Sequence, residues 1–150
     1  MDSPRPVAHK TMQQARLDFM GGRPHLAITR LTGLLNMSPS NSKVNKLLGH
    51  LLIIKGDLPR AGRYLYLESK EMQIEYKSVY LFEKTQGFDP INIAKIILPK
   101  NHFSITAIPF AKKIILCQLI LRIEEKHGAI PNFLEGIQRH LIKIGIYELR

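Results

Sequence analysis

A gapless repeat in the first half of the chain most constrains what it can fold into. Residues 8–41 align over residues 42–75, with small or apolar residues at corresponding positions. The matched pairs are Ala15 and Gly49, Leu17 and Leu51, Gly22 and Gly56, Ala27 and Ala61, and Leu31 and Leu65. A period of 34 residues is typical of a solenoid in which each repeat is one supersecondary unit. We therefore expect an all-α fold.

The small residues at the matched positions favour close packing of two helices. Ala15 and Gly49 fall in the first helix expected in each repeat, and Ala27 and Ala61 fall in the second. Small side chains at a contact shorten the distance at which two helix axes can pack. The pattern predicts two helical hairpins, each with a close contact at these positions.

Turn and capping residues indicate where these helices begin and end. Gly22 and Gly56 can adopt the left-handed backbone conformation that ends a helix, at little steric cost. Asp57 is suited to capping the second helix of the second repeat. Between the hairpins, Asn41 or Ser42 can cap the following helix.

The register of these residues resembles that of the tetratricopeptide repeat (TPR), a family of antiparallel helical hairpins. In that family the first helix carries a small residue, a glycine follows at the turn, and the second helix carries another small residue. This chain departs from the pattern, because Asp18 and Leu52 stand where the family usually has a tyrosine, and Gln73 replaces a proline. The resemblance covers residues 8–75, about half of the chain, and implies two TPR-like hairpins.

The resemblance also implies a binding surface, because the first helix of each TPR lines a groove that receives an extended peptide. The family's groove positions correspond here to His9, Met12, Gln13, Arg16, Phe19, Lys43, Lys46, Leu47, His50 and Ile53. Arg16, Lys43 and Lys46 make this surface basic, while Met12 and Phe19 offer apolar contact. Such a groove suits an acidic peptide or a C-terminal carboxylate. The alternative is that these charges only solvate an exposed helix face.

The period is lost after the second repeat. In a third copy, Glu83 would occupy the small-residue position and Pro90 the glycine position. Helical spacing of apolar residues nevertheless continues over residues 72–86. The residues at this spacing are Met72, Tyr76, Val79 and Tyr80, and Leu81 and Phe82 widen the apolar face. We expect one more helix, which packs on the second hairpin.

The C-terminal half predicts three helices without a repeat. Asp89 is suited to capping a short helix over residues 90–98 that starts with a proline. After a loop at residues 100–108, a strongly apolar helix over residues 109–126 is expected to lie buried at the centre. Residues 131–144 form the pattern of an amphipathic helix.

The length of 150 residues fits one helical domain over residues 1–150. A solenoid needs a cap over its last apolar face, so we expect residues 76–150 to form a helical cap. Residues 1–6 contain two prolines and no apolar periodicity, and we expect a loose tail there.

The formal net charge is +10, and most of the surplus lies in the N-terminal part. From Arg5 to Arg63 there are ten Lys or Arg residues against only Asp18 and Asp57. Such a surplus attracts acidic protein segments, nucleic acid or anionic lipid, without choosing among the three.

Residues that carry catalysis or bind metals form no recognisable constellation. No two of the six histidines lie at helical ligand spacing with a carboxylate or cysteine partner. There is no phosphate-binding loop or dinucleotide-binding glycine motif, and the adjacent Glu124 and Glu125 point to different helix faces. Cys117 lies in an apolar segment, which favours an inert, buried thiol. We therefore expect no metal, no cofactor and no enzymatic activity.

The start of the chain has no apolar segment typical of a secretory signal. The most apolar stretch, residues 110–123, is interrupted by Lys112, Lys113 and Arg122, which argues against a membrane-spanning helix. We expect a cytoplasmic protein.

These observations favour a protein-interaction scaffold, either an adaptor or an inhibitor, that binds a protein or acidic peptide. A small bacterial immunity or regulatory protein is one concrete form of it. The alternative is a nucleic-acid-binding protein that uses the basic N-terminal helices, although no arginine-rich run or known reader motif supports it. Peripheral membrane association through residues 110–123 is a third hypothesis, weakened by the lack of a broad polar face.

Overall fold

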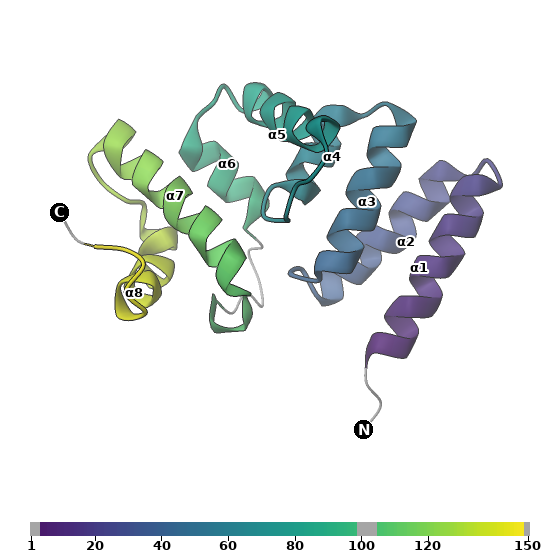
Figure 1. Cartoon of the computed structure of the whole chain (residues 1–150), viewed down its shortest axis with the longest axis horizontal. Coiled ribbons are helices and arrows are strands. Elements are labelled where there is room, and N and C mark those ends of the chain that lie inside the picture. Colours follow the sequence, from purple (N-terminus) through teal and green to yellow (C-terminus); the bar gives the residue numbers. More distant parts are fainter. Residues whose placement is uncertain (1–3, 99–104, 149–150) are drawn as a thin grey trace. The chain divides into compact units, whose positions relative to one another are not determined.

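The computed structural model describes residues 4–98 and 105–148, and every regular element within these ranges is a helix (Figure 1). The protein is therefore all-α, as its sequence predicts. Residue contacts divide the chain into two compact units, Met1–Phe82 (unit 1) and Glu83–Arg150 (unit 2), with the boundary inside helix α5. The single domain over residues 1–150 stays a prediction.

The described part of unit 1 contains four helices and the first part of a fifth. They are α1 (Pro4–Met20), α2 (Pro24–Met37), α3 (Ser42–Lys55), α4 (Leu58–Leu65) and α5 (Gln73–Thr85). Helix α1 packs against α2, and α3 packs against α4, while α2 and α3 join the two pairs (Figure 1). A helical hairpin thus lies at the place of each repeat copy.

The N-terminal segment is helical from Pro4 onward, contrary to the loose tail expected over residues 1–6. Proline lacks a backbone N–H, but the N–H groups of the first helical turn have no partner within the helix anyway. Pro4 and Pro6 are therefore compatible with the first turn of α1. Residues 1–3 lie outside the described ranges.

The hairpin turns use the two glycines that the repeat aligns. Gly22 follows α1 with a φ of 79°, and Gly56 follows α3 with a φ of 94°, so both adopt the left-handed conformation. Asp57 caps α4 and Asn41 caps α3, each by accepting a hydrogen bond from the backbone N–H three residues further on. The predicted turns and caps are confirmed at these positions.

The small residues of the repeat lie in an apolar core. Ala15, Ala27 and Ala61 are fully buried. A Cβ added to Gly49 would lie 2.5 Å from the Cγ atom of Leu65, so α3 and α4 meet closely at this glycine. The largest fully buried side chains around them are Leu31, Leu48, Leu52 and Leu65. The small residues are therefore buried in both hairpins, and a close contact is seen at Gly49 in the second.

Helices α4 and α5 meet backbone to backbone at Gly62. A Cβ added there would lie 2.0 Å from the carbonyl oxygen of Ser78 and 2.8 Å from the Cβ of Phe82. The Phe82 ring also packs edge-on against the ring of Tyr66, with their centroids 6.0 Å apart. Glycine at position 62 therefore sets how closely α5 approaches α4.

Helix α5 buries only part of the apolar face that its sequence predicts, since Phe82 is buried and Val79 packs against the core. Tyr76 and Tyr80 are exposed, whereas the buried residues are Glu75, Ser78 and Phe82. The backbone of Ser78 and the Cβ atom of Phe82 lie against Gly62, so this side of α5 faces α4. The two tyrosines are turned away from that contact.

Unit 2 contains α6 (Pro90–Ile97), α7 (Phe110–His127) and α8 (Glu135–Lys143) in its described part. Two short 3-10 turns, Ile105–Ala107 and Asn132–Leu134, precede α7 and α8. Helix α7 packs against both α6 and α8. The first 3-10 turn lies within the loop expected over residues 100–108, of which residues 100–104 are outside the described ranges.

Two acidic side chains, Asp89 and Glu83, form hydrogen bonds within unit 2. Asp89 caps α6 by accepting a hydrogen bond from the Ile91 N–H at 3.1 Å, as predicted. Glu83, which breaks the third repeat, accepts two hydrogen bonds from the guanidinium group of Arg122, at 3.0 and 3.3 Å. A charge at position 83 is thus paired with α7 within unit 2.

Helix α7 is amphipathic and not buried all round as expected. Its buried apolar residues are Leu116, Cys117, Leu119, Ile120 and Ile123. Phe110 and Ile114 are exposed, so part of the apolar circumference of α7 faces solvent. Burial raises the pKa of the Cys117 thiol, which favours its protonated form. In the described ranges, no helix has the length and apolar character needed to cross a membrane.

Replacing Gly62 with alanine should destabilise unit 1 by about 2 kcal/mol, since overpacking a tight contact typically costs about 1–3 kcal/mol. The clash is with backbone atoms of Ser78, which cannot rotate away. The free energy of unfolding, measured in urea by circular dichroism at 222 nm, tests this.

Gly33 in α2 is the matched control, because a Cβ added there meets no atom within 4 Å. Gly33→Ala should stabilise the protein by about 0.5–1 kcal/mol, since glycine costs that much inside a helix. Equal effects of the two alanines would contradict a backbone contact at Gly62.

Candidate partner-binding surface

The solvent-facing side of α1 carries three of the groove residues that the sequence predicts. His9, Gln13 and Arg16 are all exposed, and their spacing of four and three residues places them on one side of the helix. Lys43 is also exposed, in the first turn of α3. We call these four residues the basic face.

Two other predicted groove residues belong to the interior. Met12 is only 7% exposed and is part of the apolar core, so it is not available to a partner. Phe19 is half-buried and packs against the same core. Both side chains lie on the side of α1 that faces the core beside Ala15.

The remaining predicted residues on α3 are engaged by the chain itself. The Nζ atom of Lys46 donates a hydrogen bond to the Oγ atom of Ser69 at 2.7 Å. The Nε2 atom of His50 lies 3.1 Å from a carboxylate oxygen of Glu75. Leu47 and Ile53 pack against the core. The segment that leads into α5 therefore occupies part of the groove expected along α3.

The single acidic residue of α1, Asp18, is buried. Its side chain is 1% exposed, and its oxygens lie 2.6 Å from the Nε atom of Arg30 and 3.2 Å from an Nη atom of Arg23. Burial by itself raises the pKa of Asp18, but hydrogen bonds from Arg30 and Gln14 and the charges of Arg30 and Arg23 lower it below its usual value. Asp18 is thus held ionised inside the hairpin.

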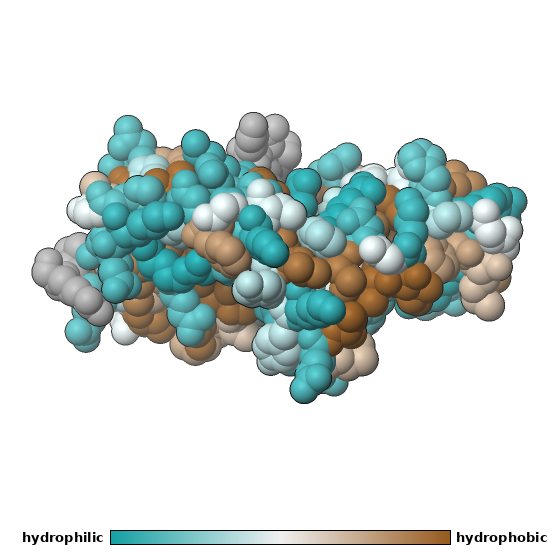
Figure 2. All heavy atoms as spheres, turned by 90° about the horizontal axis from the view of Figure 1, so that it is seen from above, coloured by the Kyte–Doolittle hydropathy of each residue, from teal (hydrophilic) through white to brown (hydrophobic). Residues whose placement is uncertain are grey.

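Because Asp18 is buried, residues 7–56 expose positive charge only. No other Asp or Glu occurs from Val7 to Gly56, so every exposed charged side chain in that stretch is basic. Figure 2 also shows hydrophobic side chains reaching the surface toward the right of the view, where the helices of unit 1 lie. Met20 and Ile54 are among the exposed apolar residues of this unit. A partner could therefore contact both basic and apolar side chains on this unit.

Glu75 is a second buried acid, at the start of α5. One carboxylate oxygen accepts hydrogen bonds from the backbone N–H groups of Glu71 and Met72, at 3.0 and 2.9 Å, and the other contacts His50. Burial alone raises the pKa of Glu75, but these backbone N–H groups and His50 lower it to about 2. Its charge stabilises the junction between α3 and α5.

The sequence carries a signal for each of these two buried acids. Glu75 stands at the third position of α5 and reaches back to the N–H groups before the helix, which is the glutamate half of a capping box. Asp18 stands where the TPR pattern usually has a tyrosine. A charged residue at a position that faces the core indicates a buried ion pair, although it does not name the partner.

No cluster of three or more His, Cys, Asp or Glu side chains in the described residues is suited to holding a metal ion. Glu124 accepts a hydrogen bond from the hydroxyl group of the buried Tyr147, while its neighbour Glu125 is exposed. Glu124 is therefore a structural partner of Tyr147 within unit 2.

Comparison with known proteins places this all-α chain with its basic hairpin in a family. Residues 7–116 match a family of unknown function (DUF6584). The match covers more than half of the chain, so the protein belongs to this family. Searches of curated proteins and of solved structures give no match.

Glu75→Gln should remove a pH-dependent part of the stability, since glutamine can still accept the backbone hydrogen bonds but carries no charge. The folded pKa of about 2 lies below the usual value of 4.5. The ionised carboxylate therefore stabilises the fold above about pH 4.5, and this contribution is lost as the pH falls toward 2. It amounts to at most about 3 kcal/mol. Urea unfolding at pH values from 2.5 to 6.5 measures it.

Glu71→Gln is the control for this experiment, because Glu71 is exposed and adjacent to the same turn. Its unfolding free energy should follow that of the unmodified protein at each pH. A Glu75→Gln variant that keeps the unmodified pH profile would contradict the role of the buried carboxylate.

Proposed function

We propose that unit 1 is a TPR-like interaction module whose basic face binds an acidic segment of a partner protein. The observation that carries the proposal is the one-sided charge from Val7 to Gly56, which results from the burial of Asp18 between two arginines. Clustered surface charge of one sign attracts a complementary partner and suppresses partners of the same sign.

The arrangement of small residues and turns supports the TPR-like part of the proposal. Each hairpin has a buried small residue in both helices and a left-handed glycine at the turn, at a spacing that the repeat preserves. In proteins with this pattern, the first helix of each hairpin offers a binding surface. Here that surface is the exposed side of α1 together with the first turn of α3.

The surface is shorter than the groove predicted from the sequence. Lys46 and His50 are bonded to Ser69 and Glu75, so the residues left for a partner are His9, Gln13, Arg16 and Lys43. Arg16 can bind a carboxylate through two parallel hydrogen bonds, which adds direction to the charge attraction. A compact acidic segment fits this surface better than a long extended peptide.

The same features support a non-enzymatic role as an adaptor or inhibitor. A protein of that kind needs only a complementary surface and no reactive group. A small immunity or regulatory protein that neutralises a partner is one form that this function takes.

A charge-reversed Arg16→Glu, Lys43→Glu variant should lose its protein partner. The tagged full-length protein is used to isolate partners from a native lysate of its organism, and bound proteins are quantified by mass spectrometry. Reversing two charges on the basic face should lower recovery at least about tenfold, since truncating a close interfacial charge pair costs about 2–5 kcal/mol. Circular dichroism confirms that the variant is folded.

Lys55→Glu is the control, because Lys55 is also exposed but lies in the last turn of α3. It should retain the partner. Equal recovery of the same proteins by the unmodified chain, the variant and the control would sink the proposal.

A further inference from the structure

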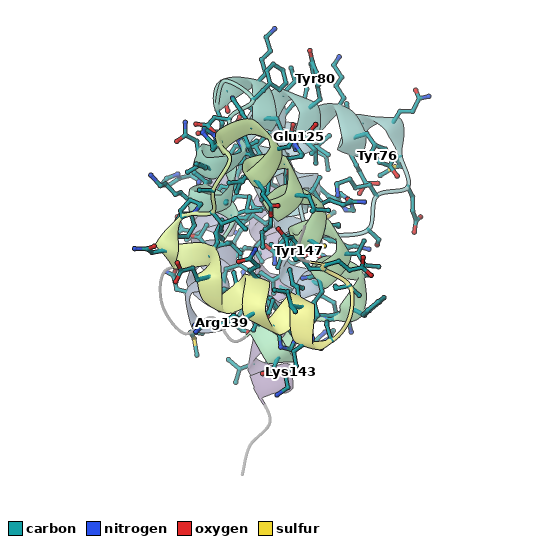
Figure 3. All side chains as sticks on the ribbon, turned by 90° about the vertical axis from the view of Figure 1, so that its left-hand side faces the viewer. Tyr76, Tyr80, Glu125, Arg139, Lys143 and Tyr147 are labelled. Carbon is teal, nitrogen blue, oxygen red and sulfur yellow. The ribbon has the colours of Figure 1, made fainter. Side chains whose placement is uncertain are left out.

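Helix α5 presents an aromatic and basic side that the basic face does not include. Tyr76 and Tyr80 are 57% and 56% exposed, and Lys77 between them is also exposed. Residues four apart on a helix have Cβ atoms about 5–6 Å apart on the same side. Figure 3 labels both tyrosines on α5. We call these three residues the tyrosine stripe.

The tyrosine stripe is held in place by contacts on the opposite side of α5. Ser78 meets the backbone of Gly62, so the helix cannot turn to bury its tyrosines. The hydroxyl group of Tyr76 also donates a hydrogen bond to the carbonyl oxygen of Lys70 at 3.0 Å, which orients its ring. The Tyr76 ring is therefore preorganised at the surface, and Tyr80 lies one turn further along the same side of the helix.

The charge of unit 1 as a whole favours a polyanion. Eleven Lys or Arg residues stand against five Asp or Glu residues from Val7 to Phe82, and three of those acids, Asp18, Glu68 and Glu75, are buried. Glu71 is the exposed acid near the start of α5. The net charge that a ligand meets on unit 1 is therefore strongly positive.

We propose that the tyrosine stripe binds single-stranded nucleic acid, with bases stacked on Tyr76 and Tyr80 and a phosphate near Lys77. Proteins that bind single strands combine exposed aromatic side chains with a positively charged path for the backbone. Every base has a flat face, so this mode needs no sequence motif. The surface is separate from the basic face, and it binds a different class of molecule.

The composition of the chain allows a direct test of stacking. There is no tryptophan among the residues, and there are five tyrosines. Tyr66 and Tyr147 are buried, and Tyr64 packs against the core, so bases stacked on the stripe should quench mainly Tyr76 and Tyr80. Tyrosine fluorescence of the full-length protein is titrated with a 20-nucleotide oligo-dT and an oligo-rU at low salt.

Binding should quench this fluorescence, and the affinity should fall as salt rises, because phosphate contacts release counterions. A Tyr76→Ala, Tyr80→Ala variant should bind at least about tenfold more weakly, measured by anisotropy of a labelled oligonucleotide. Tyr76→Phe, Tyr80→Phe should keep affinity within about threefold, since phenylalanine can still stack. Lys77→Gln should reduce the salt slope by about 0.7.

Phe133→Ala serves as the aromatic control, because Phe133 is exposed in unit 2, and Lys55→Gln serves as the charge control. Both should bind like the unmodified protein. The proposal is overturned if neither oligonucleotide binds at low salt, or if the alanine pair binds normally. It is also overturned if polyglutamate competes as well as unlabelled oligo-dT, because the surface would then recognise acidic protein or charge alone.

Discussion

Where α4 meets α5, the carbonyl group of Ser78 occupies the space in which any residue larger than glycine at position 62 would place its Cβ. This contact decides how α5 is turned about its axis. With Ser78 against α4, Glu75 comes to lie beside His50 of α3, and Tyr76 and Tyr80 face solvent. One backbone contact thus decides which side of α5 is available to a ligand.

Buried charge has a comparable effect on α1. A carboxylate in an apolar hairpin is costly unless it is paired, and Asp18 is paired with two arginines at its buried position. The pairing stabilises the ionised acid and hides its charge from solvent. The basic character of unit 1 therefore depends on the interior as much as on the number of surface lysines and arginines.

The candidate surfaces were only partly predictable. His9, Gln13, Arg16 and Lys43 are exposed as the groove positions of the resemblance imply. Met12 is buried, because residues at the same helical spacing can face either a groove or the core. Periodicity alone does not distinguish the two sides. The bonds of Lys46 and His50 join residues more than twenty positions apart, and no local pattern specifies such pairs.

The sequence by itself determined the helices, their turns and their caps. Gly22, Gly56, Asp57 and Asn41 act on backbone groups within a few residues, so their effects can be derived from local sterics and hydrogen bonding. Only the tertiary structure decided which side of α5 is buried, how Asp18 is paired and how much of α3 is covered. These depend on the shapes of surfaces that meet from distant parts of the chain, and a pattern along one helix holds no information about the surface it will meet.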